Sequence, residues 1–511
     1  MAEKDQFIAQ ISASYKPKGE SIYLGAGILD GEVIAQAEVN LALKMMNRHG
    51  LIAGATGTGK TRTLQLIAEQ LSDANVPVFM LDVKGDLSGL HEPGKPNAAL
   101  EERGQALGRP FTPAGFPIAL YSLSGQLGAP MRVKVSDFGP ILLGRVLDLN
   151  ETQTGVLSVL FKYAADQDLP IINLDDLKKV LSYLTTEEGA KEIKDSYGKI
   201  STATSTTILR KVVALEQQGI GPIFGEPALA LDDLFERIDG KGVISLLNIA
   251  DVQDQPMLFS TFLLSLLSQL FNNLPEVGDL DKPKLIFFFD EAHLLFNGAS
   301  KPFLNKIEQI VRLIRSKGVG VFFCTQAATD VPDTVLGQLG NRIQHALRAF
   351  TPNDVEALRK TAKTYPHSDF YTIDQALTSL GTGQAMITVL NDKGIPTEVV
   401  ATHLTPPRAL MGPLDQTTYQ TLVQQSEIYA KYKNPIDSRS ANEVLEERIA
   451  QQQTIQQDQS FRKNARTSTR ETPMEAMTKS ATRTLGREGV KFLAKLGTAI
   501  IAALVSKKRK N

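Results

Sequence analysis

The sequence is poor in cysteine, with one such residue among 511. A single cysteine excludes an intramolecular disulfide and any metal site built from several cysteines. That residue, Cys324, follows the apolar run 319–323, so we expect a buried small hydrophobic side chain. The chain starts without a basic segment followed by an apolar one, and no apolar run reaches the length of a membrane-spanning helix. We therefore expect a cytoplasmic protein.

The chain also has almost no net charge, −1 with a pI near 6.6, but the charge is unevenly distributed. Residues 461–511 contain thirteen Lys and Arg against three Asp and Glu, a net charge of +10, which leaves −11 for residues 1–460. An acidic body of this kind is not a general binder of nucleic acid. Any contact with DNA would have to come from a local patch or channel.

What the sequence does contain is a complete phosphate-binding loop between an apolar run at 51–53 and helix-forming residues at 64–70. The loop consists of Gly54, Ala55, Thr56, Gly57, Thr58, Gly59, Lys60 and Thr61. Its glycines let consecutive backbone N–H groups turn inward around phosphate oxygens. Lys60 would reach the β- and γ-phosphates, Thr61 would hold Mg²⁺, and we include Arg62 in the nucleotide-binding set. This pattern predicts that the chain binds ATP.

An acidic pair follows a second buried-type strand, predicted at 284–289. Asp290 would hold Mg²⁺ through water, and Glu291 would orient and activate the water that attacks the γ-phosphate. His293 is typical of a polar residue at a strand-to-helix turn, and we assign it no role. Together with the phosphate-binding loop, the acidic pair indicates an ATP hydrolase.

Four further residues each allow two interpretations. Asp82, at the end of a predicted strand, is either an acid that supports the site or a turn-forming residue. Gln326, after the strand 319–325, either touches the γ-phosphate region or is a polar loop residue. Arg312 and Arg315 lie one helical turn apart, where an arginine either stabilises phosphoryl charge, often from a neighbouring subunit, or is solvated.

Alternating strand and helix patterns predict an α/β fold, in which a mainly parallel sheet is flanked by helices. We expect a lead-in at 1–45, an ATPase core at 46–90 and 236–405, a mostly helical insertion at 91–235, a helical extension at 406–460, and a basic linker with an amphipathic C-terminal segment at 461–511. That last segment would pack on this chain or a neighbour, lie on a membrane surface, or contact nucleic acid.

Several of these motifs together resemble one family. They lie at residues 47–63, 80–86, 289–293, 315–320, 325–326 and 380–385. They resemble the HerA/FtsK class of P-loop ATPases and, more closely, the stand-alone bacterial HerA-like helicases of YjgR type. The resemblance implies a RecA-like core, a homo-oligomeric and hexameric ring, and ATP-driven movement on DNA.

The same resemblance implies roles for individual residues. Lys60 and Thr61 would bind phosphate and Mg²⁺, and Glu291 would be the catalytic base. Arg315 matches the arginine that senses or stabilises the γ-phosphate, and Gln326 matches the polar sensor. HerA helicases engage a partner nuclease through an N-terminal barrel, for which this chain has little room. Two other functions remain open: an ATPase switch that changes assembly without movement on DNA, and a secretion or conjugation pump.

Overall fold

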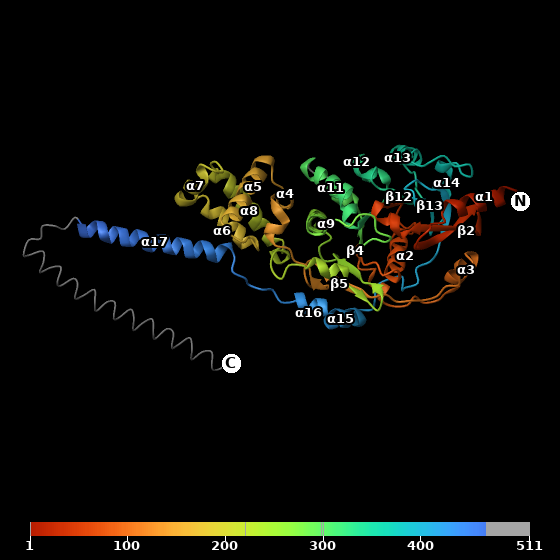
Figure 1. The fold of residues 1–511 in the computed structure, drawn as a ribbon, viewed down its shortest axis with the longest axis horizontal. Coiled ribbons are helices and arrows are strands. Elements are labelled where there is room, and N and C mark those ends of the chain that lie inside the picture. The colour runs from red at the N-terminus through yellow and green to blue at the C-terminus, as the bar shows by residue number, and fades with distance from the viewer. Residues whose placement is uncertain (1, 220, 298, 300, 467–511) are drawn as a thin grey trace, which may run out of the picture. The chain divides into compact units, whose positions relative to one another are not determined.

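The computed structural model describes residues 2–219, 221–297, 299 and 301–466 (Figure 1). The chain divides into two compact units, Met1–Asn442 and Glu443–Asn511. The amphipathic C-terminal segment and most of the predicted basic linker lie outside the described residues. No helix in the described ranges is long and apolar enough to cross a membrane.

A large sheet is the centre of the first unit (Figure 1). In the described residues it has twelve strands in the order β2-β1-β14-β13-β12-β3-β11-β10-β4-β9-β5-β6. Their bounds are β1 (Ser21–Leu29), β2 (Glu32–Ala42), β3 (Gly50–Ala53), β4 (Val78–Asp82), β5 (Ile118–Ser122), β6 (Ala129–Pro130), β9 (Ile244–Asn248), β10 (Leu285–Phe289), β11 (Val319–Thr325), β12 (Asn341–His345), β13 (Gln384–Thr388) and β14 (Val400–Leu404). The short strands β7 (Arg237–Ile238) and β8 (Lys241–Gly242) form a separate pair.

The sheet has a parallel part and an antiparallel part. The strands from β12 to β6 in the sheet order pair in parallel, whereas β13, β14, β1 and β2 pair antiparallel. In the parallel part, the ends of β3, β11 and β12 are level, because Ala53 pairs with Thr325 on one side and Gln344 on the other. The carboxyl ends of these strands therefore meet at one edge of the sheet, where open α/β sheets bind ligands.

Helices cover the sheet and form a group beyond it. The longer ones are α1 (Ala2–Ser14), α2 (Lys60–Asp73), α3 (Ala98–Ala106), α4 (Val135–Val146), α5 (Glu151–Asp166), α6 (Leu174–Tyr183), α7 (Glu187–Lys194), α8 (Thr202–Gln217), α9 (Pro256–Asn273), α11 (Lys301–Leu313), α13 (Pro352–Ala362), α15 (Gln416–Gln425) and α17 (Ala441–Arg466). The shorter ones are α10 (His293–Phe296), α12 (Asp333–Leu336), α14 (Ile373–Ser379) and α16 (Glu427–Tyr432). Helix α17 begins in the first unit and supplies the described part of the second.

Strand β10 shows how the sheet is buried on both faces. Successive side chains of a strand point to opposite faces. Phe288 belongs to the buried cluster that includes α1 and α2. Phe287 and Phe289 point the other way, where Phe289 stacks on Phe323 at 5.4 Å between ring centroids. Phe323 also contacts Phe296 of α10, which packs with α9. A strand without polar side chains is therefore stable at this position, as its continuous apolar run predicts.

The structure differs from the expected division of the chain in two places. Residues 1–45 are more than a lead-in, because β1 pairs with β14 through Gly25 and Leu404 and β2 extends the sheet further. In the described residues 2–45 there is accordingly no separate barrel. The predicted insertion at 91–235 contains α3–α8 but also contributes β5 and β6 to the sheet. Both differences arise from pairing between residues far apart in the sequence.

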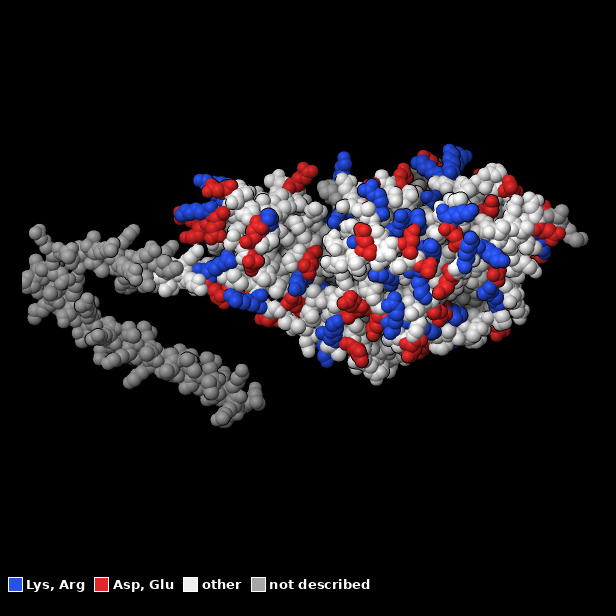
Figure 2. Space-filling model, in the orientation of Figure 1, with Lys and Arg blue, Asp and Glu red and all other residues white. Residues whose placement is uncertain are grey.

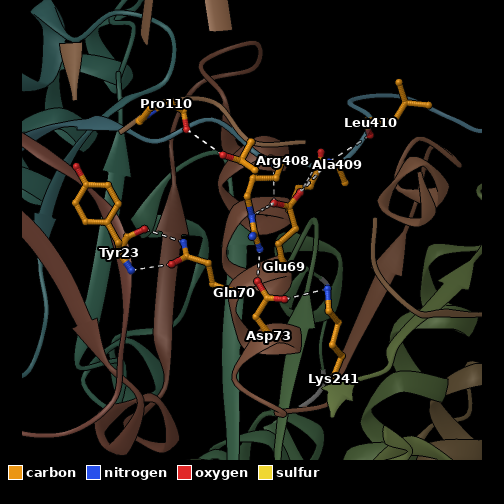
Figure 3. A network of polar contacts seen from close by, with 11 residues as sticks. Tyr23, Glu69, Gln70, Asp73, Pro110, Lys241, Arg408, Ala409 and Leu410 are labelled. Carbon is orange, nitrogen blue, oxygen red and sulfur yellow. Dashed lines mark hydrogen bonds and ion pairs between the residues drawn. The ribbon is translucent and has the colours of Figure 1, made fainter. Parts of the chain in front are cut away.

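The predicted helical extension is interrupted, and its first part runs along α2 (Figure 3). The buried carboxylate of Glu69 accepts hydrogen bonds from the backbone N–H groups of Arg408 (2.7 Å) and Ala409 (3.0 Å). Asp73 forms ion pairs with Arg408 and with Lys241, the latter at 3.1 Å. The C-terminal half of α2 is thereby fixed to this segment and to β8.

Candidate active site

The phosphate-binding loop connects β3 to α2 at the carboxyl edge of the parallel strands. Gly54, Gly57 and Gly59 have φ values of +153°, +79° and +114°, which are conformations that favour glycine. The Gly54 N–H donates to the Thr325 carbonyl (3.2 Å), and the Ala55 N–H donates to a carbonyl that follows β12 (2.9 Å). The loop is thus anchored to the ends of both strands that flank β3.

Lys60 points back into the loop from the first turn of α2. Its Nζ atom donates to the carbonyls of Gly54 (2.6 Å) and Ala55 (3.2 Å). Thr58 braces the same turn, because its hydroxyl donates to the Ala55 carbonyl at 2.7 Å. Thr61 also lies in the first turn of α2, and the exposed residues Thr56 and Gly57 form the tip. A helix N-terminus with inward N–H groups and an ammonium is suited to bind phosphate.

His345 supports the loop from beneath, a role that sequence reasoning missed. Its Nε2 atom lies 2.9 Å from the Thr63 hydroxyl. A Cβ atom added to Gly54 would come 2.5 Å from the His345 Cβ, so only glycine fits there. Burial lowers the pKa of His345 to about 4, and the charge of Lys60 lowers it further. The imidazole is therefore neutral near pH 7 and does not add a competing positive charge.

The acidic pair lies at the end of β10, two strands away from β3. Burial raises the pKa of Asp290, and the nearby Glu291 carboxylate raises it further, whereas the Cys324 thiol and the charge of Lys60 lower it. Cys324 is buried, as expected, and its thiol interacts with Asp290. Phe289, which precedes the acidic pair, pairs with Phe323 of β11, and Ala53, which precedes the loop, pairs with Thr325 of the same strand, so both motifs lie at one edge of the sheet.

Glu291 has an unusual backbone and side-chain environment. Its φ is +49°, in the left-handed region that is uncommon for a residue with a side chain. Its N–H donates to the Asp290 carboxylate at 2.9 Å. Its Oε2 atom is buried without a hydrogen bond to a described residue, and the His293 Nδ1 atom lies 3.3 Å from it. Strained residues of this kind are typical of functional sites.

A cavity of about 350 Å³ opens beside the loop. It is lined by Ala55, His293 and Gln326, among others, so Gln326 lies next to the loop. Arg348, which sequence reasoning missed, also lines this cavity. Only the order of the strands brings it there, because β12 lies beside β3 although nearly 300 residues separate them.

A second cavity of about 190 Å³ lies on the other side of the start of α2, and its walls are mainly apolar. They include Leu66, Leu404 and Pro406. Arg103 also lines this cavity, and its guanidinium donates to the carbonyls of Gly383 (3.0 Å) and Leu404 (2.9 Å). Arg62, predicted to bind nucleotide, lines the same cavity and lies 3.9 Å from Asp86.

Asp82 forms a turn. Its carboxylate accepts hydrogen bonds from the N–H groups of Asp86 (3.1 Å) and Leu87 (3.2 Å), as in the turn-forming interpretation. Burial raises the pKa of Asp82 to about 6, although the hydrogen bond from the Leu87 N–H lowers it. The residue thereby orders the loop that follows β4.

Arg315 lies away from the loop of its own chain. It precedes β11, whose first residue, Val319, is level with the first residue of β10. Burial lowers the pKa of His49 to about 4, and the nearby charge of Arg315 lowers it further, so Arg315 is close to the residue that precedes β3. The five residue steps from His49 to Gly54 span roughly 16 Å. Arg315 is exposed at the amino edge, whereas the phosphate-binding loop lies at the carboxyl edge of the same sheet.

Comparison with known proteins identifies the class to which this fold and site belong. The chain is a member of the helicase HerA-like C-terminal family, whose model matches residues 29–507. It is thus a P-loop ATPase of the HerA/FtsK class, as the motifs predict.

Individual relatives are distant. The chain is 20% identical to the DNA double-strand break repair helicase HerA of Sulfolobus acidocaldarius over 372 aligned residues. This alignment covers 72% of this chain and 68% of that protein. Among solved structures, the bacterial conjugative coupling protein TrwBdeltaN70 matches with a TM-score of 0.50 and 13% identity, over 77% of this chain and 91% of that one. TrwB in complex with the ATP analogue ADPNP matches with the same TM-score and identity, over 78% and 98%. These similarities confirm the RecA-like fold.

Proposed function

We propose that this chain is an Mg²⁺-dependent ATPase that couples ATP hydrolysis to movement on DNA as a homo-oligomeric ring. The main observation in support is that the phosphate-binding loop and the acidic pair meet at one edge of the sheet, with Lys60 close enough to lower the pKa of Asp290. A phosphate-binding loop alone would bind ATP, whereas a loop beside two acidic residues can also support hydrolysis of the bond to the γ-phosphate.

The binding step uses groups on both sides of α2. The loop N–H groups and Lys60 hold the phosphates, and the apolar cavity beside Leu66 takes the base. Thr61 and Asp290 offer the hard oxygen ligands that suit Mg²⁺. Burial and the neighbouring Glu291 carboxylate raise the pKa of Asp290. A cation bound here would offset the repulsion between these two carboxylates. Bound Mg²⁺ would neutralise charge on the phosphates.

The hydrolysis step uses Glu291. Its carboxylate accepts a proton from water while the water oxygen forms a bond to the γ-phosphorus. The bond from that phosphorus to the bridging oxygen breaks, and ADP and phosphate leave. Gln326, which lines the cavity of about 350 Å³ beside the loop, contacts the γ-phosphate and responds to its loss.

In a ring of subunits, an arginine from one subunit can reach the active site of the next. Arg315 is exposed and far from its own loop, so in our proposal it stabilises the γ-phosphate of the adjacent subunit. Assembly into a hexamer would repeat this contact at six sites.

We propose DNA as the polymer on which the protein moves, because the similar HerA protein is named a DNA double-strand break repair helicase. Figure 2 shows Lys and Arg intermixed with Asp and Glu on the visible face, without a broad basic area. We therefore place the DNA contacts in a local channel, where they would be salt-dependent and tolerant of sequence.

The decisive experiment measures ATP turnover of the full chain with Mg²⁺, alone and with single-stranded or duplex DNA. Lys60→Ala supplies the background, and EDTA removes the metal. We expect turnover that requires Mg²⁺ and rises with DNA. Turnover that neither DNA changes would contradict the motor and support an assembly switch, and stimulation by a protein substrate alone would support a pump.

A further inference from the structure

His293 and Glu291 face each other across a short, fixed turn. The His293 Nδ1 atom lies 3.3 Å from the Glu291 Oε2 atom, and each side chain is 26% exposed. The turn is held to β11 by a hydrogen bond from the Ala292 N–H to the Cys324 carbonyl (2.8 Å). It is closed by a second bond, from the Leu294 N–H to the Glu291 carbonyl (2.9 Å). Because these bonds hold the backbone of the turn, only rotation about the side-chain bonds of Glu291 and His293 can change the contact between them.

The Glu291 carboxylate has one oxygen that needs a donor. Its Oε2 atom is buried and makes no aligned hydrogen bond within the described part of the chain. A buried carboxylate oxygen without a donor is costly, and a partner removes this cost. The His293 Nδ1 atom is within hydrogen-bond distance and needs only a better alignment to act as that donor. Active-site hydrogen bonds often align fully only when the substrate is bound.

His293 also faces the cavity beside the phosphate-binding loop. It shares the wall of that cavity with Ala55 and Gln326. The imidazole therefore contacts Glu291 and also borders the cavity beside the loop.

We infer that His293 is a positioning residue for the catalytic base: its Nδ1–H group holds Oε2 of Glu291 and leaves Oε1 to accept the proton of the attacking water. This inference depends on the proposed ATPase activity. His293 forms no bond to substrate and keeps its own proton. Its effect is on the orientation of Glu291, and a catalytic group displaced by about 1 Å can lose on the order of 100-fold in rate.

The test uses two substitutions at His293 and a matched control. His293→Leu removes the donor, whereas His293→Asn keeps an N–H group close to the position of Nδ1. His367 is the control, because its Nδ1 atom makes a similar contact with Asp369 at 3.6 Å, but with 88% of the His367 side chain exposed. We expect His293→Leu to lower kcat by about 10- to 100-fold with KM changed less than twofold. His293→Asn should recover most of kcat, and His367→Leu should match the wild type.

Glu291→Gln separates positioning from other effects. In that background His293→Leu should lower the residual turnover no further, because the base is already absent. Binding of a fluorescent ATP analogue to every variant shows whether the site is intact. The inference is overturned if His293→Leu keeps the wild-type kcat, if its loss is equal in the Glu291→Gln background, or if it abolishes nucleotide binding. Wild-type protein that turns over no faster than Lys60→Ala would instead contradict the proposed ATPase.

Discussion

The two edges of the parallel part of the sheet differ in how their polar groups are used. At the carboxyl edge lie Gly54 and Glu291, whose φ values are positive, and the charged side chain of Lys60, and two cavities open beside the loop. At the amino edge, Asp73 is paired with Arg408 and Lys241 at the end of α2 (Figure 3). The first edge is arranged for a ligand and the second for stability.

Arg315 is an exception to this division, because it is exposed at the amino edge although its predicted role is at the γ-phosphate. Within one chain it lies at the edge opposite the phosphate-binding loop. The proposed role at the γ-phosphate therefore requires a second subunit that brings its carboxyl edge to Arg315.

The largest effects are expected at the carboxyl edge. Lys60→Ala should abolish tight ATP binding, because the ammonium contacts ground-state phosphates. Glu291→Gln should keep binding and lower hydrolysis by roughly 10²–10⁴-fold, because the base acts on the attacking water. Equilibrium binding of labelled ATP and steady-state phosphate release measure the two steps. Glu276→Gln is the matched control, since that side chain is 76% exposed. Near wild-type hydrolysis by Glu291→Gln would show that the acidic pair is wrongly assigned.

A smaller loss is expected when the support of the loop is disturbed. A Cβ atom at position 54 would lie 2.5 Å from the His345 Cβ, so Gly54→Ala must move the loop or β12. We expect ATP affinity to fall at least about 10-fold and stability to fall by about 1–3 kcal/mol. Gly155→Ala is the control, because a Cβ there meets no described atom within 4 Å and lies in helix α5. An unchanged affinity in Gly54→Ala would show that the loop does not depend on His345 packing.

Near the amino edge, we expect the ionisation of Glu69 to make the free energy of unfolding depend on pH. Burial raises the pKa of Glu69 to about 7, against 4.5 when unfolded, although the Arg408 and Ala409 N–H groups lower it. Between these values the native state binds more protons than the unfolded state, so stability falls as pH rises through this window. Relative to Glu69→Gln, the wild-type free energy of unfolding should fall by about 3 kcal/mol from pH 5 to pH 8.

Urea unfolding at several pH values measures this difference. Glu187→Gln, whose side chain is 82% exposed, should show no such dependence relative to the wild type. A difference between wild type and Glu69→Gln that stays constant with pH would indicate that Glu69 is charged throughout.

The smallest effect is expected from the basic tail. Removal of residues 461–511 takes away a net charge of +10. We expect DNA binding to weaken only partly, because only a few contacts to DNA phosphates would be lost. Basal ATP turnover should remain, because the catalytic groups lie in the first unit. Binding measured at two salt concentrations compares the truncated and full chains. Loss of ATP turnover on truncation would instead show that the tail is part of the folded core or a subunit interface.

The parts of the molecule that could be predicted are those encoded by neighbouring residues. The phosphate-binding loop, the acidic pair and the strands around them follow from spacing and apolar runs, and the structure brings them together. The pairing of β1 with β14 could not be predicted, because it joins residues about 380 positions apart. The role of His345 depends on strand order in the same way. The position of Arg315 could have been inferred, since it precedes a parallel strand whose far end carries Gln326.

The central claim, that two subunits share each active site, is tested most directly by mixing two inactive variants. Arg315→Ala keeps its loop but cannot complete a neighbour's site, and Lys60→Ala has the reverse defect. After subunit exchange, with assembly checked by light scattering, interfaces that join an intact loop to an intact arginine should regain turnover, by a factor on the order of 10³ over either variant alone. No recovery in mixed assemblies, or a stable monomer with full activity, would contradict the claim.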